Sequence, residues 1–247
     1  IFVKLFDFFY IDKVSFLDEG LSSYTGRVVS KKYRHWILKL LINLNVSSLF
    51  LNKVSKIYLF EPALYSGPSI RIIKIPKLIL QQRKDKVTER NKIIFLGVEP
   101  DTAHNLLENL DTNMVSFRES INKTTDFVYR KISEKGGIYR PHPVESTYWS
   151  KLSRRKPCYF SNSNWELEVS KRISKNDLII SYMSSASIMP KVLYGTEPKL
   201  IFLYDILDEN FLGSNILISK IRNLYDDPKK VFVPSSMDEI EKIIKEH

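Results

Sequence analysis

The segment LIISYMSSASIMPKVLYGTEPKLIFLY, residues 178–204, determines the expected fold class. It opens with an apolar run at 178–181, continues with a helical pattern at 184–194 and closes with a second apolar run at 200–204. Short apolar runs on either side of a helix are typical of a βαβ unit, in which parallel strands are buried on both faces. The segment therefore predicts an α/β protein with a parallel sheet.

The same alternation of strand and helix patterns extends outward from this segment. Further strands are expected at residues 14–17, 57–60, 93–96 and 137–140, and further helices at 116–134, 165–172 and 237–246. A charged stretch at 81–91 has the composition of a linker or an exposed helix. We therefore predict two Rossmann-like lobes joined near residues 80–91. The first lobe, residues 1–82, begins incomplete, and the second comprises residues 83–247.

Composition narrows the class of protein and its compartment. Hydrophobic residues make up 43% of the 247 residues, which excludes global disorder. The single cysteine, Cys158, cannot form an internal disulfide, which fits the reducing cytoplasm. No stretch reaches the roughly 18 uninterrupted apolar residues of a membrane-spanning helix. The net charge of +10 suggests an anionic partner: nucleic acid, an acidic membrane surface or a nucleotide-sugar. A solvated lysine-rich surface is the alternative.

An acidic turn follows the first expected strand. In open α/β sheets, ligands bind outside the carboxyl ends of parallel strands, and Asp18-Glu19-Gly20 comes directly after residues 14–17. A carboxylate here could act as a general base toward an acceptor hydroxyl. Gly20 would allow a sharp turn and leave room for substrate. The alternative is an ordinary strand-to-helix turn, because acidic residues also favour helix amino termini.

Two further loops follow expected strands in the second lobe. In Arg140-Pro141-His142-Pro143 the prolines stiffen the backbone around a histidine that could donate to, or protonate, a leaving phosphate. Ser184-Ser185-Ala186-Ser187 precedes a helical pattern, where hydroxyls and backbone amides can bind an anion. A structural histidine and plain helix capping by serine are the alternatives.

Several common signatures are missing from the chain. It contains no GxxxxGK[ST] or GxGxxG loop, no HExxH, no zinc-spaced cysteines and no Asp-X-Asp metal motif of nucleotide-sugar transfer. We therefore expect neither a metal nor a cofactor.

Taken together and in this order, the three loops resemble the motifs of bacterial sialyltransferases of the GT-B architecture. That group includes lipooligosaccharide sialyltransferases and capsular polysialyltransferases. The resemblance rests on Leu17-Asp18-Glu19-Gly20-Leu21-Ser22-Ser23-Tyr24, on Arg140-Pro141-His142-Pro143 and on Ser184-Ser185. The strand at 93–96 with Gly97 resembles the start of the nucleotide-binding lobe in that group. This chain departs from the family at Val144, where a basic residue often follows His-Pro.

The resemblance implies an inverting transfer of sialic acid from CMP-sialic acid to a hydroxyl of a capsule or lipooligosaccharide glycan. The first lobe would then carry the acceptor and the second the nucleotide. Asp18 or Glu19 would be the base, and His142 would assist the leaving phosphate. The nucleotide-binding residues implied are Gly97, Arg140, His142, Pro143, Glu166, Ser184 and Ser185, with Glu166 on the ribose hydroxyls.

The expected partners follow from the same resemblance. They are the nucleotide-sugar donor, a glycan or glycolipid acceptor, peripheral contact with the anionic inner face of the bacterial inner membrane, and a second copy in a homodimer. A transferase of Kdo from CMP-Kdo is the nearest alternative. A basic nucleic-acid-binding protein is an alternative of another class, although its aromatic residues are not interleaved with basic ones as a stacking platform requires.

Overall fold

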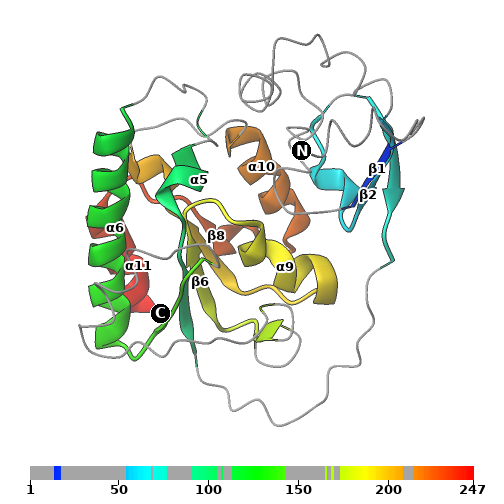
Figure 1. Cartoon of the computed structure of the whole chain (residues 1–247). Helices are drawn as coiled ribbons and strands as arrows, with labels where there is room; N and C mark the ends of the chain where they lie inside the picture. The colour runs from blue at the N-terminus through cyan, green and yellow to red at the C-terminus, as the bar shows by residue number, and fades with distance from the viewer. Residues whose placement is uncertain are drawn as a thin grey trace. The chain divides into compact units, whose positions relative to one another are not determined.

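The chain divides into two units, Ile1–Leu78 and Ile79–His247, which are described separately. The computed structural model (Figure 1) describes residues 14–17, 54–67, 69–76, 91–104, 107, 113–142, 165, 168–169, 173–207 and 214–247. For residues 14–17, 54 and 101–102 only the backbone is described.

The first unit contains a parallel three-stranded sheet in the order β1-β2-β3. The strands are β1 (Val14–Leu17), β2 (Val54–Leu59) and β3 (Arg71–Lys74). The first two were predicted, with β2 beginning three residues before the expected position 57, whereas β3 was not. Ile57 and Leu59 of β2 are buried, as is Leu64 of the 3-10 helix η2 (Pro62–Leu64) that follows.

The second unit is built on a parallel five-stranded sheet in the order β5-β4-β6-β7-β8. Every residue of its two central strands β4 and β6 is buried, which explains their mainly apolar sequences, IIFL and LIIS. The strands are β4 (Ile93–Leu96), β5 (Ile138–Arg140), β6 (Leu178–Ser181), β7 (Lys199–Phe202) and β8 (Val231–Phe232). The first four confirm predicted strands, and β8 is new.

Helices cover both faces of this sheet. From β4 the chain winds to β5 on one side, and from β6 through β7 to β8 on the other, so right-handed crossovers put their helices on opposite faces. In Figure 1, α6 and α11 lie together on one face and α9 and α10 on the other. The helices are α5 (Pro100–His104), α6 (Met114–Glu134), α9 (Ser185–Tyr194), α10 (Ser214–Leu224) and α11 (Met237–Glu246).

The strand order identifies where a ligand would bind. Numbered along the chain, the sheet has the order 2-1-3-4-5, so the winding direction reverses between β4 and β6. In doubly wound α/β proteins the ligand crevice opens at the carboxyl ends of the strands beside this switch point. The α/β prediction is confirmed, and the second unit is compatible with a Rossmann-like fold.

A buried hydrogen-bonded tyrosine anchors the chain just after β6. The Tyr182 hydroxyl donates to Ile121 O at 2.9 Å and lies 2.8 Å from Thr125 Oγ1, both on α6. The ring of Tyr182 is fully buried against Phe95 of β4. Because a buried hydroxyl is costly unless it is hydrogen-bonded, these bonds hold the β6 end in one position relative to α6. The loop that leads into α9 therefore starts from a rigid point.

An ion-pair cluster fixes the opposite end of α9. Gly195 ends this helix in the left-handed region, with a φ of 72°, which favours glycine. The buried Glu197 pairs with Lys191 and accepts a hydrogen bond from Asp226 N at 2.8 Å. Burial alone would raise the pKa of Glu197, but these two contacts outweigh it and the pKa is lowered. The charged cluster thus lies away from the carboxyl edge and serves to hold α9.

No helix among the described residues is long and apolar enough to cross a membrane.

Candidate functional site

Three loops of the second unit emerge at one edge of the sheet. Strand β4 pairs with β5 through Leu96 and Arg140, and with β6 through Phe95 and Ile180, so the carboxyl ends of these three strands are neighbours. Gly97 N donates to Arg140 O at 2.7 Å and ties the first two ends together. The backbone amide of the predicted nucleotide-binding Gly97 is thus already engaged. The structure brings Gly97, Arg140 and the beginning of α9 to the carboxyl edge beside the switch point.

Trp165 contacts both the end of β5 and the first turn of α9. The Cζ atom of Arg140 lies 5.3 Å from the centroid of the Trp165 ring, within the range of a cation–π contact. The same indole donates from Nε1 to Ala186 O, in the first turn of α9, at 2.7 Å. Trp165 is only 8% exposed. One buried side chain therefore contacts both Arg140 and the start of the serine-capped helix.

The acceptor of the Trp165 hydrogen bond is explained by a proline inside α9. In a regular helix, Ala186 O would accept from the N–H four residues later, but that residue is Pro190, which has no N–H. The indole Nε1 supplies the missing donor. Trp165 and Pro190 both fall in helices expected from the sequence, but neither was given a role in the site. The signal available was a proline within a helical pattern, which implies a carbonyl that needs another partner.

The serine hydroxyls at the start of α9 differ in their hydrogen bonds. Ser184 is the N-cap, and its Oγ accepts from Ala186 N at 3.3 Å. Ser187 turns back on its own helix and donates to Ser184 O at 2.5 Å. The Oγ of Ser185 makes no hydrogen bond among the described residues. Capping by Ser184 is therefore real, and the hydroxyl of Ser185 is the one available to an anion at the helix amino terminus.

His142 follows β5 by two residues and is half-buried. Burial lowers the pKa of its imidazole below the ordinary 6.5, which favours the neutral ring. A neutral imidazole still carries one N–H and can donate to a phosphate oxygen. An arriving negative charge would favour protonation and could turn the ring into a cationic partner.

Ser181, the last residue of β6, adds a polar group close to this edge. It is 0% exposed, and its Oγ has no hydrogen-bond partner among the described residues. Buried hydroxyls without a partner are uncommon in folded proteins. This serine belongs to the switch-point strand and was not singled out from the sequence.

Several predicted site residues lie outside the described residues. These are the acidic turn with its glycine, the second proline of the His-Pro loop and the carboxylate expected on the ribose: Asp18, Glu19, Gly20, Pro143 and Glu166. Two of their neighbours are described, because β1 ends at Leu17 and Trp165 is helical. The roles of these five residues stay predictions.

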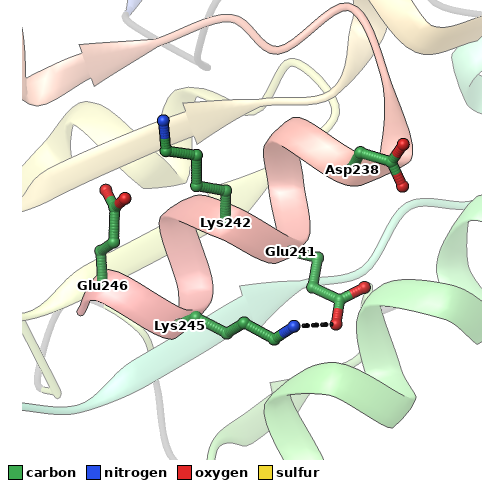
Figure 2. A pocket seen from close by; sticks show the side chains of 5 residues that line it. All are labelled: Asp238, Glu241, Lys242, Lys245 and Glu246. Carbon is green, nitrogen blue, oxygen red and sulfur yellow. Dashed lines mark ion pairs between the residues drawn. The ribbon is translucent and has the colours of Figure 1, made fainter.

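A surface hollow along α11 is a different kind of feature. It has a volume of about 420 Å³, and Figure 2 shows five charged side chains of this one helix around it: Asp238, Glu241, Lys242, Lys245 and Glu246. Lys245 Nζ lies 2.6 Å from Glu241 Oε1, which also pairs with Lys131 of α6 at 2.8 Å. None of the predicted site residues lines it. The hollow is the outer face of a charged helix, on which Glu241 pairs with Lys245 and Lys131.

The described residues hold no cluster of three or more histidine, cysteine or acidic side chains that could bind a metal ion. Comparison of the chain with protein-family models, with curated proteins and with solved structures found no match. The resemblance of the three loops to sialyltransferase motifs thus stays a hypothesis that rests on those residues.

The two adjacent serines should respond differently to mutation. If the start of α9 binds the phosphate of CMP, as the resemblance implies, Ser185→Ala is expected to weaken binding of CMP about tenfold without changing the melting temperature, because it removes a hydroxyl from that site. Ser184→Ala should instead destabilise the protein by about 1 kcal/mol, the usual cost of losing an N-cap. Calorimetric titration and thermal melts of both variants check this division. Equal loss of stability in both would mean that Ser185 is also structural.

Proposed function

We propose that the chain is an inverting glycosyltransferase that moves sialic acid from CMP-sialic acid to a hydroxyl of a surface glycan, in a capsule or a lipooligosaccharide. The observation that carries the proposal is the meeting of Arg140, the His142 loop and the amino terminus of α9 at the switch-point edge of a parallel sheet. The order of the acidic, His-Pro and Ser-Ser motifs supports the choice of donor.

The second unit would hold the nucleotide of the donor. Its phosphate would bind at the amino terminus of α9, where the helix dipole, the Ser185 hydroxyl and the Arg140 guanidinium all favour a negative charge. His142 would donate a hydrogen bond to the same phosphate. Glu166 would accept hydrogen bonds from the ribose hydroxyls. Each group acts on the part of the donor that becomes the leaving CMP.

The first unit would supply the base and the acceptor site, and the two units would form the two lobes of a GT-B enzyme. Asp18 or Glu19 takes the proton of the acceptor hydroxyl as its oxygen attacks the anomeric carbon. The bond from that carbon to the phosphate oxygen breaks, and its electron pair leaves with CMP. Negative charge then grows on the phosphate, and donors held in place there lower the barrier by about 3 to 4 kcal/mol each.

Donor binding is the direct test of this proposal. Calorimetric titration with CMP, UDP and GDP should give binding of CMP and at least tenfold weaker binding of the other two, or about 1.4 kcal/mol of discrimination. Equal affinities, or none for CMP, would contradict the donor class. Competition between CMP-sialic acid and CMP-Kdo then separates sialyl transfer from Kdo transfer, because both donors share the leaving nucleotide.

The compartment belongs to the same proposal. We propose that the enzyme works in the cytoplasm, at the inner face of the bacterial inner membrane, where lipid-linked acceptors would be made. The support is the net charge of +10, since each basic residue near an anionic surface contributes about 1 kcal/mol of attraction.

A further inference from the structure

We infer that Trp165 is a positioning residue that holds Arg140 against the first turn of α9, so that Arg140 and the helix amino terminus bind one phosphate together. This inference rests on the proposed function, because the phosphate is that of the CMP donor. Neither Trp165 nor Pro190 belongs to the motifs on which the proposed function stands. The inference therefore adds a residue, and a reason for its position, to that site.

The position of the indole follows from the covalent structure of α9. Pro190 leaves Ala186 O, which is partly buried, without its helical donor, and a carbonyl shielded from water without a donor is costly. Trp165 Nε1 donates to this oxygen at 2.7 Å, a short and specific bond for an indole that has only one donor. The buried Trp165 ring thereby becomes fixed relative to the first turn of α9.

The fixed indole in turn restricts Arg140. Its guanidinium carbon lies 5.3 Å from the ring centroid, and its backbone oxygen is held by Gly97 N at 2.7 Å. A free arginine side chain loses roughly 2 kcal/mol of rotamer entropy when a ligand immobilises it. The cation–π contact with the buried ring removes part of that loss before the ligand arrives. Arg140 is thus prepared to donate to an anion at the adjacent helix amino terminus.

Arginine is the residue type that this arrangement requires. A guanidinium is planar, stacks on an aromatic face and keeps edge N–H groups for a phosphate, whereas the ammonium of lysine does not stack in this way. The two contacts also join Arg140 of β5, the helical residue Trp165 and Ala186 of α9, which lie far apart in the sequence. Loss of the indole should therefore impair phosphate recognition, although the indole itself does not contact the phosphate.

The main experiment compares CMP with cytidine, which lacks the phosphate. Calorimetric titrations are made with the full chain and with Trp165→Leu, Trp165→Phe, Arg140→Gln and the double variant Trp165→Leu/Arg140→Gln. We expect Trp165→Leu and Arg140→Gln each to weaken CMP binding about tenfold, and the double variant to lose little more. Cytidine affinity should change less than twofold in every variant. Trp165→Phe keeps a ring and should fall in between.

The outcomes separate the inference from the proposed function. If the unmodified chain fails to bind CMP, the proposed function is wrong and the role in nucleotide binding falls with it. If the chain binds CMP and Trp165→Leu binds it equally well, only the inference is wrong. A merely structural role would lower the melting temperature and the fraction of protein able to bind, but it would leave the ratio of CMP affinity to cytidine affinity unchanged. An unchanged ratio in Trp165→Leu would therefore also overturn the inference.

A second measurement tests the hydrogen bond without any nucleotide. Pro190→Ala returns an N–H to the position that faces Ala186 O. In that background, Trp165→Phe should lower the melting temperature by less than it does in the unmodified chain, because the carbonyl then keeps a donor. Equal shifts in melting temperature with Pro190 and with Pro190→Ala would show that Nε1 does not take the place of the N–H that Pro190 lacks. The reason given for the position of the indole would then be removed.

Discussion

Either Asp18→Asn or Glu19→Gln should lose more turnover than any other variant, because one of these two carboxylates is the proposed general base. Loss of a base typically slows a reaction about a hundredfold to ten-thousandfold. CMP affinity should stay nearly unchanged, since in the proposed mechanism neither carboxylate contacts the nucleotide. A low kcat with an unaltered dissociation constant for CMP separates the base from a donor-binding residue.

Matched controls distinguish this outcome from loss of folded protein. Asp238→Asn and Glu119→Gln make the same chemical changes at exposed helix positions of the second unit and should leave kcat unchanged. If the acidic turn only caps a helix, the Asp18 and Glu19 variants would lower the melting temperature, and activity would follow the folded fraction. Full activity in both carboxylate variants at unchanged stability would overturn the mechanism.

The central strands of the second unit could be predicted because burial on both faces leaves a clear mark in sequence. Every residue of β4 and β6 is buried, and apolar residues fill β4 and the first three positions of β6. The long helix α6 was predicted for a related reason: its buried residues, from Phe117 to Ile132, recur at helical spacing. Such elements are specified by pattern alone.

The missed elements lack such a pattern or have a weak one. Strand β3 has only two apolar residues between Arg71 and Lys74, and both are partly exposed. Strand β8 is two residues long, so that its pairing with β7 depends on the sheet already being present. Helix α10 is different, since Leu217, Ile218 and Ile221 are buried at helical spacing and a systematic count would have found it.

The candidate site shows a similar division. The loops after β5 and β6 could be predicted to approach one another, because the carboxyl ends of parallel strands share an edge. The role of Trp165 could not be predicted in this way. It depends on a hydrogen bond to Ala186 O, 21 residues away, and on a proline whose effect exists only once α9 has formed. The separate states of Ser184 and Ser185 likewise require the actual capping geometry.

His142→Ala is the second prediction with a large effect, and it differs in kind from the acidic variants. In the proposed mechanism His142 contacts the donor phosphate both in the bound donor and as charge develops on it. The variant should therefore raise KM and lower kcat, with kcat reduced by about a hundredfold or more, as for other single donors to a developing negative charge. His142→Gln keeps an N–H donor without a titratable ring and should recover part of the KM loss.

The same histidine makes donor binding depend on pH in a defined direction. Burial lowers the pKa of His142 below 6.5 in the free protein, and a bound phosphate should raise it, so the bound state holds more protons. Affinity for CMP-sialic acid should then increase as pH falls from the bound-state pKa to the free-state pKa and level off outside this window. The phosphodiester of the donor does not itself titrate near neutral pH. Calorimetry in two buffers of different ionisation enthalpy should detect proton uptake with the unmodified chain and none with His142→Gln. Equal uptake by both proteins would assign the proton to another group and remove His142 from the donor phosphate.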